Sequence, residues 1–162
     1  MKGTESFELM ARYNQWMNGK LYVVCAEVPD AERKTDRGAF FSSIHGTLNH
    51  LMFGDYAWMN RLANRTYDIK PIGEDYFEEF EQMRSAREAL DEDILTWSST
   101  IDPAWLAEEI TWVSKAYDRE FTHSNWQLVT HMFNHQTHHR GQLTTLLAQA
   151  GKDYGPTDIP FM

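Results

Sequence analysis

The sequence has few of the features that mark secreted or membrane proteins. Its 162 residues include a single cysteine, Cys25, so no intramolecular disulfide can form. No apolar run approaches the roughly 18 residues of a membrane-spanning helix, and the segment MKGTESFELMARYNQW lacks the apolar stretch of a signal peptide. We therefore expect a cytoplasmic protein with no membrane partner, in which Cys25 is a core residue.

Basic residues are also scarce. The chain has 15 Lys and Arg against 24 Asp and Glu, which gives a formal net charge of −9. Binding to phosphate-rich surfaces requires a surplus of positive charge, so we expect no nucleic-acid partner. Hydrophobic residues make up 42% of the chain, which excludes a disordered protein, and the length predicts one domain, residues 1–162.

Apolar residues recur at helical spacing over four long segments that short connections join. Ser42 or Ser43 can cap the second segment, and the fourth begins at Ser124, whose spacing from Gln127 is that of a capping box. Gly151 is suited to end the fourth helix. The sequence predicts an all-α four-helix bundle, with helices at about residues 5–28, 42–63, 76–100 and 124–151.

The segment between the third and fourth helices has a different pattern. DPAWLAEE could form a short helical turn, and apolar residues then alternate with polar ones from Ile110 to Phe121. This alternation predicts a small β-hairpin before the last helix. The tail KDYGPTDIPFM contains two prolines, and we expect it to be extended.

Four of the seven histidines lie in HMFNHQTHHRGQL, residues 131–143. On a helical projection with about 100° per residue, His139 falls within the apolar arc and His135 at its edge, whereas His131 and His138 lie further out. Residues four apart have β-carbons about 5–6 Å from each other, so the inward pair could bind one metal ion. The alternative is two hydrogen-bonded core histidines. A metal site would also need a third ligand from elsewhere.

The segment SIHGTLNHLMFGDYAW offers three candidates for that ligand, namely His45, His50 and Asp55. His50 projects away from the main apolar stripe of this helix, and Asp55 falls within the stripe, which is unusual for a carboxylate. We therefore expect the helix to be buried on two sides, against the bundle and against another helix or a second subunit. Gly46 and Gly54 would permit close approach. Periodicity does not choose among the three candidates.

Three segments together resemble one known family. YNQWMN, TLNHLMFGDYAWMNRL and NHQTHHRGQL are similar to the DinB-like four-helix-bundle proteins, a family that also includes the bacillithiol S-transferases, and the similarity extends to the tail YGPTDIPFM. The resemblance implies one divalent metal ion per chain, Zn, Ni or Fe, held by His50, His135 and His139. It does not extend to His131 or His138 as ligands, although His131 could line the pocket.

Three neutral imidazoles leave a metal ion with open positions, which is typical of catalytic sites. The resemblance therefore implies a metal-dependent thiol S-transferase, whose partners are a small cellular thiol and an electrophile. A hydrolase is one alternative, although Gln136 stands where zinc peptidases of the His-Glu-x-x-His type carry a glutamate base. Asp55, Asp158 or His131 could supply a base instead, and we take His131 and Asp55 as the catalytic candidates.

A metal-binding or stress-response protein without catalysis is the second alternative. We also expect a homodimer, because six tryptophans and a helix buried on two sides leave apolar surface for self-association. For Arg140 and Gln142 we favour a structural role, in which they hold the last helix to its neighbours by hydrogen bonds, and contact with a substrate is the alternative.

Overall fold

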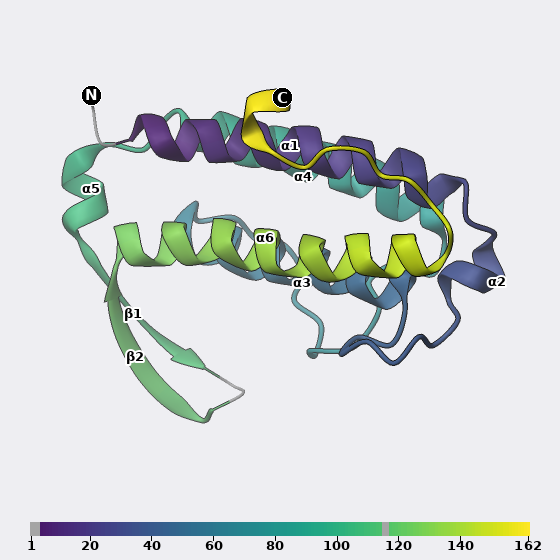
Figure 1. Cartoon of the computed structure of the whole chain (residues 1–162). Helices are drawn as coiled ribbons and strands as arrows, with labels where there is room; N and C mark the ends of the chain where they lie inside the picture. The colour runs from purple at the N-terminus through teal and green to yellow at the C-terminus, as the bar shows by residue number, and fades with distance from the viewer. Residues whose placement is uncertain (1–3, 115–116) are drawn as a thin grey trace.

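The computed structural model describes residues 4–114 and 117–162 (Figure 1). In chain order its elements are α1 Glu5–Ala26, α2 Asp30–Arg33, α3 Ile44–Leu62, α4 Phe80–Ser98, α5 Pro103–Ala107, β1 Glu109–Ser114, β2 Arg119–Ser124, α6 Asn125–Gln149 and the 3-10 helix η1 Ile159–Phe161. The four long helices and the hairpin before the last of them confirm the predicted fold class. None of the described helices is long and apolar enough to cross a membrane.

The long helices form two layers. Helix α1 packs against α4, helix α3 packs against α6, and α1 also contacts α6 (Figure 1). The hairpin extends away from the bundle at the N-terminal end of α6, and the C-terminal tail passes over α1. Tyr13 on α1 donates a hydrogen bond to the carbonyl of Thr157 at 2.6 Å, which holds the tail on the layer opposite to α3.

Side chains at the helix ends satisfy backbone groups as the sequence predicts. Ser43 caps α3 by accepting a hydrogen bond from the N–H of Gly46 at 3.0 Å. Ser124 and Gln127 form the capping box of α6, in which the N–H of Ser124 donates to Gln127 Oε1 at 3.3 Å. Gly151, with φ 71°, follows the end of α6 in the left-handed conformation that ends many helices.

The start of α4 differs from the prediction. Residues 76–79 were predicted to be helical, but the helix begins at Phe80. The side chain of Asn49 accepts hydrogen bonds from the N–H groups of Tyr76, at 2.8 Å, and Phe77, at 3.0 Å, and donates to the carbonyl of Phe77 at 3.1 Å. These contacts replace the hydrogen bonds that a further helical turn would supply, so the segment follows the surface of α3 instead.

Helix α3 is buried on nearly all sides within the single chain, as the sequence predicts for two-sided burial. Its apolar residues Leu48, Met52 and Met59 belong to the common core, together with the fully buried Cys25. Burial raises the pKa of the Cys25 thiol to about 12, so this residue is an unreactive core side chain, as expected.

A cluster of buried polar side chains joins all four long helices. Arg87 on α4 contacts Asp55 on α3 at 2.6 Å and Asp91 on its own helix at 2.7 Å. Asn18 on α1 donates to Asp91 at 2.9 Å. The same helix provides Asn14, which binds both Asp91, at 3.3 Å, and Arg140 of α6.

The charges in this polar cluster balance, because two guanidinium groups accompany two carboxylates. Arg87, Asp55, Asp91 and Arg140 are each at most 3% exposed. A charge buried to this degree is tolerated only with a partner of opposite sign or several hydrogen bonds. The polar cluster therefore explains Asp55 in the apolar stripe of α3, and it confirms a structural role for Arg140.

Replacing Arg87 by Met should lower the free energy of unfolding by about 3–5 kcal/mol, because two buried carboxylates would lose their counter-charge. Arg84→Met is the matched control on the same helix. Arg84 forms ion pairs at the surface, with Glu88 at 3.3 Å and Glu81 at 4.0 Å, and its replacement should change stability by less than about 1 kcal/mol. Urea unfolding followed by circular dichroism measures both, and equal effects would contradict the role given to Arg87.

Candidate metal centre

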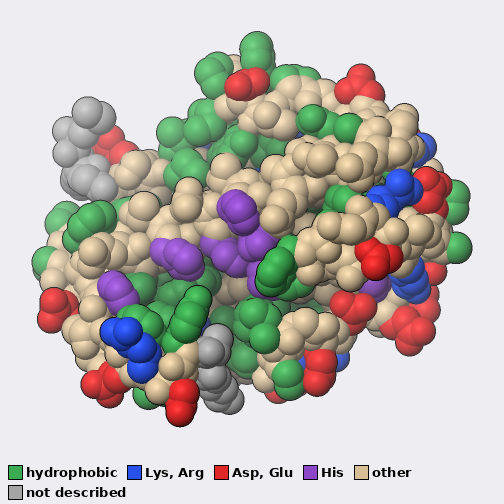
Figure 2. Space-filling view, turned by 60° about the horizontal axis from the view of Figure 1, so that its bottom comes forward, with side chains coloured by type: hydrophobic (Ala, Val, Ile, Leu, Met, Phe, Trp, Pro, Cys, Tyr) green, Lys and Arg blue, Asp and Glu red, His purple; other side chains and the backbone are tan. Residues whose placement is uncertain are grey.

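Three imidazoles from two helices of one layer converge on a common point. His50 Nε2 on α3 lies 3.2 Å from His135 Nε2 and 3.1 Å from His139 Nε2, both on α6. Within the described residues, these three histidines form the group of side chains that could hold a metal ion. Figure 2 shows histidine side chains gathered together on the face of the molecule that carries this site. His50, His135 and His139 are the three residues that the resemblance to the DinB-like proteins implies as ligands.

The spacing of the nitrogen atoms fits a single metal ion. With metal–nitrogen bonds of about 2.0–2.1 Å, tetrahedral ligands lie about 3.3 Å apart and ligands at right angles about 2.9 Å apart. The observed distances of 3.1 and 3.2 Å lie between these two values. The ligand atoms of all three histidines lie within 4.8 Å of one another, so one ion could contact all three. The donor set suits Zn, Ni and Fe alike, so it does not select among them.

The electrostatics of the site favour neutral imidazoles, which are the form that binds metals. Burial lowers the pKa of His50 to about 3, and the nearby His139 acts in the same direction. Burial also lowers the pKa of His135 to about 3, with contributions from His139 and His50. For His139, burial lowers the pKa, while its hydrogen bond to Gln142 acts in the opposite direction. At neutral pH all three rings can therefore offer a lone pair.

His139 is oriented by a hydrogen bond within α6. Its Nδ1 lies 2.7 Å from Gln142 Oε1, and since an amide oxygen can only accept, Nδ1 carries the proton. That tautomer leaves the lone pair on Nε2, which faces the other two histidines. Partners of this kind fix metal-binding histidines in many proteins. Gln142 was expected to hold α6 to its neighbours, but its hydrogen bonds are to His139 and His138 of its own helix. Its position three residues after His139 is the sequence signal that could have indicated this role.

His135 is oriented by packing on a glycine. A β-carbon added to Gly54 would lie 2.6 Å from His135 Cε1 and 3.0 Å from its Nδ1, which is too close for non-bonded atoms. Gly54 is one turn after His50 on α3. The absence of a side chain at this position therefore provides the space in which the His135 ring reaches His50, as the sequence analysis expected in general terms for close helix approach.

His50 is covered by the loop that precedes α3. The ring of Phe41 stacks on His50, with centroids 3.7 Å apart, and meets the edge of His139 at 5.6 Å. A β-carbon at Gly46 would lie 2.2 Å from the carbonyl oxygen of Phe41, so Gly46 allows this loop to lie against the helix. No sequence pattern indicated Phe41, because it lies in a loop and reaches the site only through the fold.

The remaining candidates lie elsewhere. His45 Nε2 is 2.9 Å from the carbonyl oxygen of Phe77, so this histidine contacts the loop before α4 and not the other histidines. Asp55 is buried in the ion pair with Arg87. His131 is exposed on one side and packs edge-on against Trp58 on the other, with centroids 4.9 Å apart, and its ring is 5.9 Å from that of His135. His138 is also exposed.

A cavity of ≈ 850 Å³ adjoins the candidate site on the side of His50. Its lining combines aromatic rings with polar and charged groups from α3 and from the loops on either side of it, including Phe41, His45, Lys34, Lys70 and Asp75. This volume is in the range of sites that bind small molecules. Of the three histidines, His50 lines this cavity, so a ligand in it would approach the candidate site along the side of His50.

Comparisons with known proteins bear on the family and the fold of the chain. The family model described as the DinB family matches residues 1–162. The chain is 26% identical over 156 residues to Protein DinB of Bacillus subtilis (strain 168), covering 90% of this chain and 87% of that protein. Its fold is similar to the crystal structure of a DinB-like protein from Bacillus cereus ATCC 10987, with a TM-score of 0.64, 16% identity and coverage of 94% and 93% of the two chains.

Gly54→Ala should lower the affinity for a divalent metal by about 10- to 100-fold, the range observed when the groups that orient metal ligands are changed. The new methyl group would displace the His135 ring, whereas the higher helix propensity of alanine should preserve or raise thermal stability. Gly141→Ala is the control, because a β-carbon there meets nothing within 4 Å. Competition against a metal-sensitive dye measures the affinities, and equal values in both variants would refute the role of Gly54.

Gln142→Met should lower metal affinity by a similar factor of about 10 to 100, because His139 would lose the acceptor that fixes its tautomer. Gln149→Met, at an exposed position near the end of the same helix, is the matched control and should bind metal as the wild type does. The same dye competition applies. An unchanged affinity in Gln142→Met would mean that packing alone orients His139.

Proposed function

The chain belongs to the DinB family, and from this premise we propose that it is a metal-dependent thiol transferase in which His50, His135 and His139 hold one divalent ion. The observation that carries the proposal is the convergence of the three Nε2 atoms, within 3.2 Å of His50 Nε2, beside a cavity large enough for a small molecule. A closed structural site would normally have a fourth protein ligand. Among the described residues, the group that could hold a metal contains only these three.

The proposed reaction joins a small cellular thiol to an electrophile. An ion bound to three neutral imidazoles keeps its full charge, retains positions for a substrate, and lowers the pKa of a thiol that binds to it. The sulfur forms a bond to an electrophilic carbon, and the leaving group departs with the electron pair of its bond to that carbon. The proton of the thiol passes to a base or to solvent. The cavity beside His50 would hold the thiol, because its lining offers hydrogen-bonding and charged groups of both signs.

Of the two candidates for proton transfer, His131 is the better placed. Its ring is the neighbour of His135 on the open face of α6, and partial burial lowers its pKa, with His123 acting in the same direction. A larger share of His131 is therefore neutral at pH 7 and able to accept a proton. Asp55 is fully buried, and Arg87 occupies one of its carboxylate oxygens, so we assign it to the stability of the fold.

Hydrolysis is supported less well. Gln136, at the position of the glutamate base in the His-Glu-x-x-His zinc peptidases, is 1% exposed and accepts a hydrogen bond from Arg140 at 3.3 Å. It therefore belongs to the polar cluster between the helix layers and does not face the three histidines. A metal-binding protein without catalysis is the remaining alternative, and only an assay separates it from a transferase.

A homodimer stays a prediction from the sequence. One of the two features that suggested it, the second face of α3, is covered within a single chain. Sedimentation of the purified protein tests the oligomeric state directly.

The function is tested by measuring metal content and thiol conjugation on the same samples, purified without a nickel column. We expect about one metal ion per chain in the wild type and in His138→Ala, since His138 is exposed and adjacent to His139 without facing the site. His135→Ala should lose the metal and, with it, conjugation of small thiols to a chromogenic aryl halide. Metal binding without turnover for any thiol would favour the non-catalytic alternative, and turnover that is independent of metal would contradict the proposal.

A further inference from the structure

On the helix that carries His50, Arg61 has no carboxylate partner among the residues that the structure describes. Its guanidinium lies against two indole rings, 5.1 Å from the centroid of Trp58 and 4.9 Å from that of Trp112 on β1. Nη1 donates one hydrogen bond, to the carbonyl of Ala57 at 3.2 Å. A guanidinium has five N–H groups, so most of its donor capacity is available to a ligand.

Among the described residues, three of the nine arginines form no ion pair with Asp or Glu, namely Arg61, Arg119 and Arg140, although the chain has a net charge of −9. In the described part of the chain, six other arginines form ion pairs with Asp or Glu, namely Arg12, Arg33, Arg37, Arg65, Arg84 and Arg87. Arg61 is also partly buried, and this burial lowers its pKa. Desolvating a cation without a counter-charge has a free-energy cost that an anionic ligand would offset.

The position of Arg61 relates it to the three histidines. Arg61 follows His50 by eleven residues, which at about 100° per residue places the two within about 20° on the same face of α3. The hydrogen bond to Ala57 directs the guanidinium back toward His50. At about 1.5 Å per residue, the level of Ala57 is about 10 Å from that of His50 along the helix axis.

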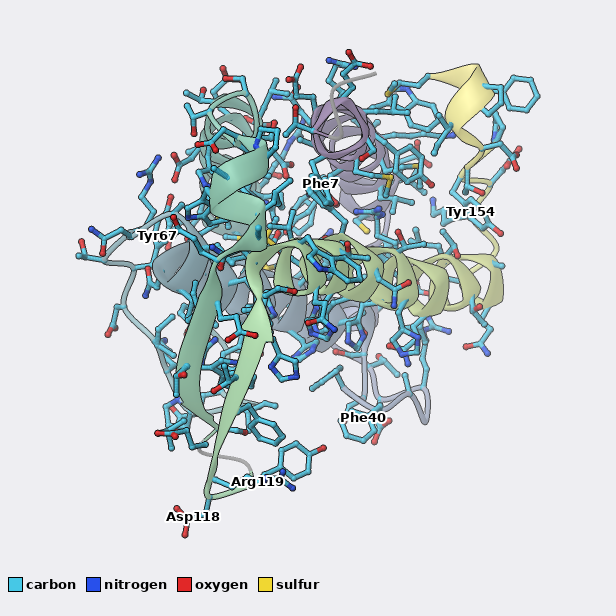
Figure 3. The ribbon with its side chains drawn as sticks, turned by 90° about the vertical axis from the view of Figure 1, so that its left-hand side faces the viewer. Phe7, Phe40, Tyr67, Asp118, Arg119 and Tyr154 are labelled. Atoms are coloured by element: carbon cyan, nitrogen blue, oxygen red, sulfur yellow. The ribbon has the colours of Figure 1, made fainter. Side chains whose placement is uncertain are left out.

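A row of aromatic rings joins the two points. Trp58 lies 5.6 Å from Trp112 and 4.9 Å from His131, which in turn lies 5.9 Å from His135. The hairpin that carries Trp112 and the loop that carries Phe40 project from the same side of the α3–α6 layer, as the labelled Phe40, Asp118 and Arg119 indicate (Figure 3). A ligand between them would lie along the aromatic row.

We propose that Arg61 binds the terminal oxyanion, a carboxylate or a phosphate ester, of a substrate whose reacting end lies at the three histidines. The electrophile in the proposed transfer is then an organic anion with about 10 Å between its acid group and its reacting carbon. This inference rests on the proposed function, since it requires a reacting centre at the histidines.

The cavity on the other side of His50 is less suited to an anion. Its two lysines already have partners, since Lys34 pairs with Asp30 at 2.8 Å and Lys70 donates to the carbonyl of Asp75 at 2.7 Å. Glu74, Asp75 and Glu78 also line this cavity. The two sides of the site therefore favour ligands of different charge. A polar thiol fits the cavity, and the anionic electrophile fits the side of Arg61.

The test uses zinc-loaded protein and a series of straight-chain hydroxamates of increasing length, whose head group binds the metal. The far end carries a carboxylate, a phosphate or a neutral methyl group, and calorimetry measures each affinity. At the length that reaches Arg61, the wild type should bind an anionic probe at least about tenfold more tightly than the neutral one. In Arg61→Gln the ratio of the two affinities should fall to about one, and the affinity for the neutral probe should be unchanged. Arg61→Lys should retain part of the preference for the anionic probe.

Arg119→Gln and the double variant Lys34→Gln, Lys70→Gln are the controls, and both should keep the wild-type ratio. Arg119 stacks on Phe121 at 4.5 Å, on the same face of the hairpin as Trp112 but nearer its tip, so its replacement removes a similar cation that lies further from the three histidines. A ratio that survives Arg61→Gln, or that is lost in the lysine variant, overturns the proposal while the metal site stands. If Arg61 only supports the hairpin, Arg61→Gln should weaken all probes equally. If the zinc-loaded wild type binds no probe, the proposed function and this inference both fail.

Discussion

The ion pairs of Arg87 determine how the four helices meet. Its guanidinium lies between Asp55 of α3 and Asp91 of α4, and the amides of α1 extend the contacts to Arg140 of α6. Hydrophobic contacts tolerate small shifts of one helix along another, but buried charges do not, because a shifted charge loses its partner in a medium that cannot solvate it. The polar cluster therefore fixes the register between the layers.

The same register brings the histidines together. Asp55 follows His50 by five residues on α3, while Gln136 and Arg140 directly follow His135 and His139 on α6. On both helices, one side chain enters the polar cluster and its near neighbour turns to the opposite side, where the imidazoles converge. The fold thus separates two tasks that lie a few residues apart in the sequence. Charges inside the bundle hold the helices in place, and uncharged rings at the open face remain available for ligands.

Much of this arrangement could be predicted from the sequence. Periodicity gave the four helices, the hairpin and the inward pair His135 and His139, because these depend on spacing within one segment. The choice of His50 over His45 needed the resemblance to the DinB family, since both residues are buried on α3 and only the tertiary structure separates their contacts. Two features could not be predicted, namely the stacking of Phe41 on His50 and the non-helical conformation of residues 76–79 before α4. Both depend on contacts between segments that are distant in the sequence.

The convergence of His50 with His135 joins positions that are 85 residues apart in a chain without disulfides. An unfolded chain does not hold His50 beside His135 and His139. An ion that needs all three rings would therefore bind the folded state almost exclusively. Ligand binding of that kind adds to the free energy of unfolding, by about 2.7 kcal/mol when the free ion is at a hundredfold excess over its dissociation constant. Metal supply in the cell would then set the lifetime of this protein as well as its chemistry.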